Sequence, residues 1–447
     1  MLIRMRRYRH ICLVLAIAAV MMLYACGYRD GSPAGTGAFV HDAGGTVAVI
    51  TGDNADTAGP ADIGDIAADT ADTTDNVPGS AATAAGDTPG ASGDPAVGVI
   101  NNSADTDDND TAVVDSAAPG NRQYTYDFTV AFAGDINLAD NWDNMQYCST
   151  TENGIYDCIS PELIQMMRDA DITCINNEFT FSTRGAPLKN KVYTFRAHPS
   201  NVGILKEMGV DIVSLANNHV YDYGEESLID TMATLKQAGI KYVGAGHNLD
   251  EAMEPVYFEV QGKTVAFVAA SRAEKYKMTP QATEDSPGIL RCYDTTLFKQ
   301  VIRKAGENAD YVIAYVHWGT EFTHKLEDVQ LSTGKEYLDA GADIVIGAHP
   351  HRLQGIEFYK GKPIIYSLGN FWFNDETVDT VLLKIRFFGN DTEEYLELKV
   401  VPAIQADLRT TIVTDDAERE RIFSLLERIS VNAEISGKGI ITERAAE

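Results

Sequence analysis

The chain contains 447 residues, and its 65 acidic side chains outnumber its 36 lysines and arginines, so its formal net charge at pH 7 is −29. Binding to nucleic acid depends on basic surfaces that neutralise backbone phosphates, so this composition argues against a nucleic-acid partner. A large share of the acidic excess lies before residue 123, so the net charge says little about the remainder of the chain.

Residues 1–25 have the organisation of a signal peptide. Four arginines between Arg4 and Arg9 precede an apolar run from Ile11 to Leu23. That run has 13 residues, whereas a membrane-spanning helix needs roughly 20, and its length is typical of a signal-peptide core. It ends in Leu23-Tyr24-Ala25-Cys26, which resembles the lipobox of bacterial lipoproteins.

The lipobox resemblance implies that residues 1–25 are removed and that the Cys26 thiol receives a diacylglyceryl group. Each methylene of such an anchor that enters the membrane adds about 0.8 kcal/mol to the affinity. We therefore expect an exported protein, lipid-anchored to the outer face of the bacterial cytoplasmic membrane without spanning it. Ordinary signal cleavage or an uncleaved anchor, with Cys26 incidental, is the alternative.

Residues 26–123 have the composition of a disordered linker. Alanine, glycine, aspartate, threonine, serine and proline dominate, and residues 27–122 contain no glutamate or lysine. Such a segment has too little apolar surface to offset the entropy of ordering it, and its aspartates repel one another. We interpret it as a tether through a cell-wall layer, and neutral filler is the alternative.

The cysteines give two further expectations. Cys148 and Cys158 lie ten residues apart in a polar stretch, and an oxidising compartment favours a disulfide between them. Cys174 and Cys292 lie in apolar contexts that are typical of buried thiols. The sequence has no Cys-x-x-Cys pair, which argues against a zinc site built from thiolates.

From residue 124 to about residue 410, apolar runs alternate with helical patterns. The runs typical of buried strands are Phe128–Phe132, Ile172–Ile175, Asp211–Leu215, Tyr311–Val316 and Asp343–Ile346. The helical segments between them are Ser160–Arg168, Glu225–Ala238, Thr295–Glu307 and Asp328–Ala340. Antiparallel pairs are expected for Val256–Val260 with Thr264–Ala270, Gly355–Tyr359 with Lys362–Ser367, and Val381–Arg386 with Glu394–Val401.

Strands that alternate with helices predict a sheet whose faces are covered by helices. The hairpins add antiparallel strands, so we expect an α/β sandwich with a central mixed sheet or two packed sheets, flanked by helices. We assign this domain to residues 124–410. Residues 411–447 follow as a C-terminal helix and tail, with an amphipathic helix over Asp415–Ile429.

Strand after strand ends in a short polar cluster. The clusters are Gly134-Asp135, Asn176-Asn177-Glu178, Ala216–His219, His317–Glu321 and Gly347–His351. In open α/β sheets, sites form outside the carboxyl ends of the strands, so these clusters converge if the strands are neighbours. Carboxylate, amide and imidazole groups together suit zinc, manganese or iron. The sequence therefore predicts a divalent-metal site at this edge.

Six blocks in series closely resemble the CapA-type capsule-synthesis family, which is associated with making or exporting poly-gamma-glutamate. They are Phe132–Asp135, Asn177-Glu178, Ser214–His219 with Asp222 and Gly224, His317-Trp-Gly with Glu321, Gly341–Asp343 through His349-Pro-His351, and Tyr366–Phe371. The resemblance spans about residues 129–373. It implies a fold similar to that of the calcineurin-like metallophosphoesterases, a metallophosphatase-like sandwich.

The resemblance also implies roles for individual residues. Asp135 and His351 would bind a first metal, Glu178 would bridge, and Asn218, His317 and His349 would serve a second. His219 would be the catalytic residue that is not a ligand, and stabilises or protonates the leaving group. Two metals about 3.5–4 Å apart can activate a bridging water and clamp an in-line displacement, a reaction in which Asp135 also takes part.

Two departures from the phosphoesterase pattern leave the metal count open. Asn137 stands where the pattern has a histidine ligand, and Glu178 replaces a shorter aspartate. One ion, two ions or an empty site are therefore all retained. Glu321 and Asn370 are candidate substrate-binding residues, with a local salt bridge and a strand-to-loop turn as their structural alternatives.

Three functions follow from these observations. The first is a cell-surface lipoprotein that helps a membrane-bound synthase or export complex to make or export an anionic poly-gamma-glutamate-type polymer from its precursor. The second is an envelope metal-dependent hydrolase that acts on a phosphoester or an amide. The third is a catalytically inactive polymer-binding module on the same fold. The family resemblance alone favours the first.

Overall fold

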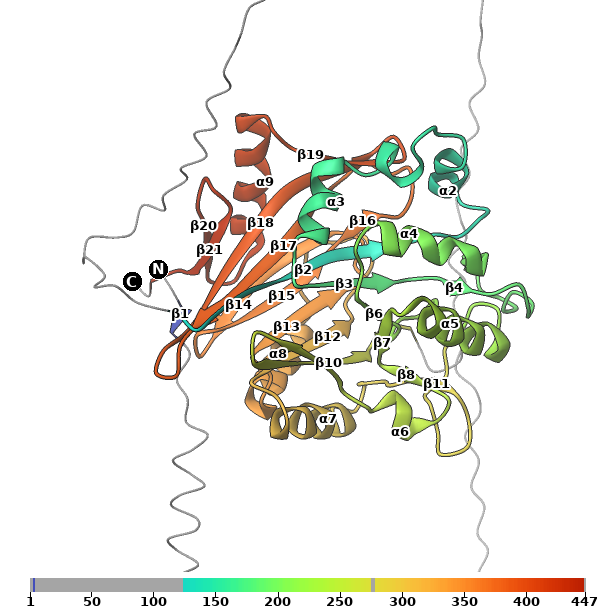
Figure 1. Ribbon diagram of the computed structural model, residues 1–447, viewed down its shortest axis with the longest axis horizontal. Helices are drawn as coiled ribbons and strands as arrows, with labels where there is room; N and C mark the ends of the chain where they lie inside the picture. Colours follow the sequence, from blue (N-terminus) through green and yellow to red (C-terminus); the bar gives the residue numbers. More distant parts are fainter. Residues whose placement is uncertain (1–2, 5–123, 275–277, 446–447) are drawn as a thin grey trace, which may run out of the picture. The chain divides into compact units, whose positions relative to one another are not determined.

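The computed structural model describes residues 3–4, 124–274 and 278–445 (Figure 1). The leader apart from residues 3–4, the lipidation candidate Cys26 and the linker lie outside the described residues, so the predictions made for them stay predictions. In the described part of the chain, no helix is long and apolar enough to cross a membrane.

Two mixed sheets form the centre of the domain. The first contains β20 (Ala433–Ile435), β21 (Ile440–Glu443), β18 (Glu394–Ala406), β17 (Val378–Gly389), β2 (Tyr126–Ile136), β3 (Ile172–Asn177), β6 (Ile212–Ser214) and β7 (Lys241–Val243), in that order. Off this path, β1 (Ile3–Arg4) and β19 (Arg409–Ile412) pair with β18, and β16 (Asn370–Trp372) pairs with β2. The second has the order β14 (Leu353–Tyr359), β15 (Lys362–Leu368), β13 (Ile344–Ala348), β12 (Tyr311–His317), β10 (Lys263–Ser271) and β9 (Val256–Val260).

Short pairs and helices complete the domain. The pairs are β4 (Thr180–Phe181) with β5 (Arg196–Ala197), and β8 (Ala245–Gly246) with β11 (Gly288–Ile289). The helices are α2 (Asp143–Cys148), α3 (Pro161–Arg168), α4 (Val202–Glu207), α5 (Glu225–Ala238), α6 (Leu249–Ala252), α7 (Thr296–Glu307), α8 (Asp328–Ala340) and α9 (Asp416–Ile429), with single 3₁₀ turns η1 (Gly154–Asp157) and η2 (Pro199–Asn201).

The sheets pack face to face because their strands are apolar on both sides. In β12, Tyr311, Ile313 and Tyr315 belong to the core shared with the first sheet. The residues between them, Val312 and Ala314, belong to a separate core, as expected when successive side chains point to opposite faces of a strand. Helices α7 and α8 cover that outer face, and α3, α4 and α5 cover the outer face of the first sheet (Figure 1).

The predicted α/β sandwich flanked by helices is therefore confirmed. Of the two arrangements expected, a central mixed sheet or two packed sheets, the structure has two packed sheets. The predicted buried strands correspond to β2, β3, β6, β12 and β13, and the predicted helices to α3, α5, α7 and α8. The predicted antiparallel pairs are β9–β10, β14–β15 and β17–β18. The expected C-terminal helix is α9, whose Ile422, Phe423 and Leu426 close one side of the core between the sheets.

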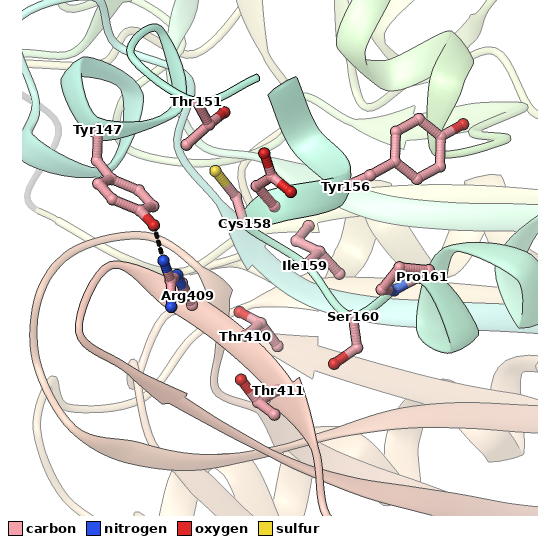
Figure 2. Close-up of a pocket in the computed structure, with 11 residues that line it drawn as sticks. Tyr147, Thr151, Tyr156, Cys158, Ile159, Ser160, Pro161, Arg409, Thr410 and Thr411 are labelled. Atoms are coloured by element: carbon pink, nitrogen blue, oxygen red, sulfur yellow. Dashed lines mark hydrogen bonds between the residues drawn. The ribbon is translucent and has the colours of Figure 1, made fainter. Parts of the chain in front are cut away.

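The cysteines differ from expectation at one point. Cys174 and Cys292 are buried thiols, as predicted. Cys148 and Cys158 are also free and buried, so the expected disulfide is absent from this structure. Their side chains instead form a hydrogen bond with each other. Cys158 lines a cavity of about 410 Å³ between η1 and β19, where the Arg409 guanidinium donates to the Tyr147 hydroxyl (Figure 2).

The close approach of two backbones near the end of β2 generates a prediction. A Cβ on Gly134 would lie 2.0 Å from the carbonyl oxygen of Gly369, in backbone that cannot move aside freely. Gly134→Ala should therefore lower the free energy of unfolding by about 2–3 kcal/mol, as overpacking does. Urea unfolding of the purified protein measures this change.

Gly203 provides the matched control, because it lies in α4 and a Cβ there would meet no atom within 4 Å. Gly203→Ala should be neutral or stabilising by up to about 1 kcal/mol. Equal stabilities for the two variants would show that the contact at Gly134 does not constrain the fold.

Candidate metal centre

The polar strand ends meet at one edge of the sandwich. β2, β3 and β6 run parallel in the first sheet, and β10, β12, β13 and β15 run parallel in the second. The carboxyl ends of both sets of strands contribute to one buried group of side chains. Its members are Asp135, Glu178, Asn218, His219, His317, His349, His351 and Asn370.

Two sets of ligand atoms overlap at Glu178. In one set, Asp135, Glu178 and His351 place their ligand atoms within 4.8 Å of one another, and in the other, Glu178 does so with His317 and His349. A carboxylate shared by two such sets is arranged as a bridging ligand. The side-chain oxygen of Asn218 lies 2.7 Å from His317 Nε2, beside the second set.

Glu178 has one carboxylate oxygen without a hydrogen-bond partner among the described residues, as expected where side chains could hold a cation. Its Oε1 is buried and accepts no hydrogen bond from the described residues. It lies 3.6 Å from His317 Nε2 and 3.8 Å from His351 Nε2. The pKa of Glu178 lies well above its ordinary value, because burial disfavours the charged form and Asp135 adds a second negative charge. Buried carboxylate and imidazole groups with an unused oxygen could hold a divalent metal ion.

Two of the three candidate ligand histidines are neutral. Burial lowers the pKa of His317 and of His349 well below the ordinary value. Both ring nitrogens of His317 have partners, because Nε2 lies 2.7 Å from the Asn218 oxygen and Nδ1 lies 3.3 Å from the Asn176 amide nitrogen.

Burial also disfavours charged His351. The hydrogen bond and the negative charge of Asp135, the charge of Glu321 and the hydrogen bond to Asn370 together outweigh burial and raise the pKa of His351. His351 Nδ1 lies 2.8 Å from the Asn370 oxygen, which leaves Nε2 turned toward Glu178.

The backbone that presents these two histidines is strained. His349 has a φ of 98° and His351 a φ of 55°, in the left-handed region that favours glycine. Residues with side chains occupy this region at a cost of about 1–3 kcal/mol each, and such strain concentrates at functional sites. The turn that follows β13 is thus unfavourable for stability. It places the imidazole rings of His349 and His351 at the edge of the sandwich where the other ligand groups lie.

Next to the ligand groups, His219 belongs to a chain of buried charges. Its Nδ1 lies 2.7 Å from Asp222 Oδ2, and the other oxygen of Asp222 lies 2.8 Å from the Lys191 ammonium. Lys191 also pairs with Glu274 at 3.3 Å and donates to the backbone oxygen of Asn218. Burial lowers the pKa of His219, against the opposing charge of Asp222. The contact with Asp222 therefore fixes the orientation of the ring, and burial favours the neutral imidazole.

Two residues of the site were missed by the sequence prediction. The amide nitrogen of Asn176 donates to Asp135 Oδ1 at 2.8 Å and to Glu178 Oε2 at 3.0 Å, so it orients both carboxylates. Asn176 lies inside a predicted polar cluster, so its position was available as a signal. Lys191 lies in the irregular segment between β4 and β5, where no pattern pointed to it.

The remaining predicted residues lie at the margin. Glu321 is partly exposed and its Oε1 lies 3.9 Å from His349 Nε2, at the entrance to the site. Asn370 is buried against His351, so in this structure it orients a candidate ligand. The Asn137 oxygen accepts a hydrogen bond from its own chain at Ala139, 2.9 Å away, and so closes a turn.

Comparisons with known proteins identify the relatives of the chain. Residues 129–375 match the family described as bacterial capsule synthesis protein PGA_cap. The chain is 36% identical to the capsule biosynthesis protein CapA of Bacillus anthracis, over 52% of this chain and 57% of that protein. It is 30% identical to the PGA biosynthesis protein CapA of Bacillus subtilis, over 60% of this chain and 70% of that protein. The chain thus spans little more than half of the first relative.

Solved structures show only weak likeness. A putative 5′-nucleotidase from Staphylococcus aureus aligns with 67% of this chain and 58% of that chain, at 16% identity and a TM-score of 0.38. A hypothetical protein from Thermus thermophilus aligns with 61% of this chain and 99% of that chain, at 16% identity and a TM-score of 0.37.

The raised pKa of Glu178 predicts that metal binding releases a proton. A ligand carboxylate must be ionised, and burial beside Asp135 keeps Glu178 protonated above its ordinary pKa. Below the raised pKa of Glu178, each mole of Zn²⁺ or Mn²⁺ bound should therefore release about one mole of protons from Glu178, and the affinity should rise with pH. Below the raised pKa of His351, that ring should add to the release. Calorimetry in buffers of different ionisation enthalpy measures the release.

Glu178→Gln should bind the metal more weakly and release no such proton. Glu357→Gln is the control, because Glu357 is a buried glutamate of β14 whose partners are Tyr366 and Lys335. Unchanged proton release in Glu178→Gln would place the metal away from these residues.

Proposed function

Because the chain belongs to the bacterial capsule synthesis protein family, we propose that it acts in making or exporting a poly-gamma-glutamate-type capsule polymer. The family predicted from the sequence blocks is thereby confirmed. Its relatives are named for capsule biosynthesis, for PGA biosynthesis and, in Mycobacterium tuberculosis, for probable polyglutamine synthesis accessory function. The partners in this proposal are a membrane-bound polymer synthase or export complex and the anionic polymer or its precursor.

The proposed location is the outer face of the cytoplasmic membrane. The support is the arginine-rich leader and the lipobox-like sequence that ends in Cys26. Residues 26–123 would then span the distance between the membrane and the domain. A protein held in this way remains beside a membrane enzyme while it reaches the emerging polymer.

The observation that carries a chemical role is the pair of ligand groups that share Glu178. A divalent ion held by Asp135, Glu178 and the three histidines, whether zinc, manganese or iron, would supply a Lewis acid and an ionised water at neutral pH. His219 contacts Asp222 through Nδ1, so Nε2 is the nitrogen that remains for proton transfer. It would give a proton to a departing group only after the ring has been protonated.

This arrangement favours a second candidate function, metal-dependent hydrolysis in the cell envelope. The bond cleaved would be an amide of the polymer or a phosphoester of its precursor, since both reactions need an activated water and a protonated leaving group. The hydrogen bond that Asn137 makes within its own turn favours a third candidate, a polymer-binding module with an incomplete metal site.

Lipid anchoring is tested with the Cys26→Ala variant in the native host. Without the thiol no lipid can be attached, so the protein should move from the membrane fraction to the soluble or secreted fraction, and the amount of capsule polymer should fall. Cys12→Ala is the control, because Cys12 lies within the leader and should be removed with it. A Cys26→Ala protein that stays in the membrane fraction would contradict lipidation at this residue.

The chemical role is tested with Asp135→Ala and His219→Ala in the metal-loaded protein. Removing a general acid or a ligand should lower hydrolysis of an aryl phosphodiester by about 10²–10⁴-fold, while the melting temperature stays within a few degrees of the parent. His247→Ala is the control, because His247 is exposed and paired with Glu251. Wild-type activity in both site variants would show that the strand ends are not the functional site.

A further inference from the structure

A buried lysine lies where three segments of the chain meet beside the candidate metal centre. Lys191 belongs to the segment between β4 and β5, and its side chain is only 7% exposed. Asp222 comes from the loop between β6 and α5, and Glu274 from the segment after β10. Their carboxylate oxygens lie 2.8 Å and 3.3 Å from the Lys191 ammonium. A lysine in this place has two candidate tasks, to bind an anionic substrate or to hold the groups that react with it.

The surroundings of the ammonium argue against substrate binding. A lysine ammonium has three N–H donors. The backbone carbonyl oxygen of Asn218 accepts from Lys191 and is the third protein oxygen around it, beside those of Asp222 and Glu274. Three oxygens thus match three donors, and an incoming anion would have to displace one of them from a buried side chain. The contacts therefore favour the task of holding other groups.

The carboxylate of Asp222 connects Lys191 to His219. Its Oδ1 faces the ammonium, and its Oδ2 lies 2.7 Å from His219 Nδ1. The backbone N–H of Phe195, in the same segment as Lys191, donates to that Oδ2 at 2.7 Å. One segment thus contacts both oxygens of the carboxylate that orients the ring. Because Asp222 is fully buried, its charge would be costly without the lysine.

The backbone carbonyl of Asn218 connects Lys191 to the ligand groups. The Thr279 hydroxyl donates to the same oxygen as Lys191, at 2.7 Å. Thr279 is fixed in turn, because the buried Arg291 guanidinium donates to its carbonyl oxygen at 2.6 Å. The side-chain oxygen of Asn218 lies 2.7 Å from His317 Nε2. Lys191 therefore contacts the backbone of a residue whose side chain belongs to the ligand groups.

We propose that Lys191 is a positioning residue, which holds Asn218 and His219 in the geometry in which they act and does not bind the substrate. This inference rests on the hydrolytic function proposed above and assigns a role within that site. A residue that binds substrate and transition state equally contributes to KM, whereas one that holds the reacting groups contributes to kcat. Loss of Lys191 should therefore lower kcat and leave KM unchanged.

The test is steady-state hydrolysis of an anionic aryl phosphodiester by Lys191→Met loaded with Zn²⁺. Methionine has nearly the length of lysine but no charge, so kcat should fall about 10²-fold, as a misplacement of about 1 Å produces, while KM stays within about twofold. Lys263→Met is the matched control, because Lys263 is also largely buried and pairs with Asp310 at 3.4 Å and Glu394 at 3.2 Å. It lies at the opposite end of β10 from the site, so its kcat should equal that of the parent.

A second measurement does not depend on turnover. In the metal-free parent, the imidazole N–H that His219 directs at Asp222 is buried, and NMR can assign it by its absence in His219→Gln. In Lys191→Met this proton should exchange with water faster, because the carboxylate that holds it is less firmly fixed. Lys263→Met should leave its exchange rate unchanged.

A further variant keeps the test valid if Lys191→Met folds poorly. That change leaves Asp222 and Glu274 without their cation, and an unpaired buried charge is destabilising. Lys191→Met combined with Glu274→Gln has the net charge of the parent, because one charge of each sign is removed. This double variant should melt close to the parent and still show the fall in kcat.

The outcomes separate this inference from the function on which it rests. A raised KM with a parent-like kcat would make Lys191 a substrate-binding residue and overturn its positioning role, and the hydrolytic function would stand. Parent-like values of both constants in a folded variant would overturn the positioning role as well. A parent protein without metal-dependent hydrolysis would overturn the hydrolytic function and, with it, the role of Lys191.

Discussion

The burial of two carboxylates beside three histidines is the interaction on which the rest of the site depends. Asp135 and Glu178 are shielded from solvent and lie close to each other, and such a pair is unfavourable unless a cation or a proton compensates it. Lys191 reduces the cost only from a distance, because its ammonium is paired with Asp222 and Glu274. Compensation in the metal-free protein therefore comes from protons on Glu178 and His351, whose pKa values are both raised, and from a divalent ion where one is bound.

The fold maintains this arrangement because backbone packing leaves little freedom near the site. A Cβ on Gly347 of β13 would lie 1.9 Å from the carbonyl oxygen of Tyr366 in β15. The two strands are therefore too close at this point for any residue other than glycine. Trp318 donates its indole N–H to the same oxygen at 3.0 Å and fixes the segment after His317. The strained turn at His349 is attached to these strands. The stability of the two sheets thus supports a local geometry that the turn would not adopt by itself.

Most of the scaffold could be predicted from the sequence, because it depends on local patterns. Short runs of apolar residues identified the strands, and the polar clusters that follow them located the ligand groups, since parallel strands end at one edge. Lys191 could not be found in this way. It lies in an irregular segment, and its position depends on a contact with Asp222, which is distant in sequence. The disulfide expected from the spacing of Cys148 and Cys158 also failed, because spacing alone does not decide whether two thiols are joined.

The charges around His219 distinguish the competing functions. A module that only binds polymer needs an exposed surface with suitable shape and charge. The structure additionally buries Asp222 and most of Lys191 to orient one imidazole ring. Burying an ion pair costs desolvation energy that its attraction often does not recover. Orientation and proton supply are what a catalytic histidine requires, so the Lys191–Asp222–His219 chain favours hydrolysis over binding alone.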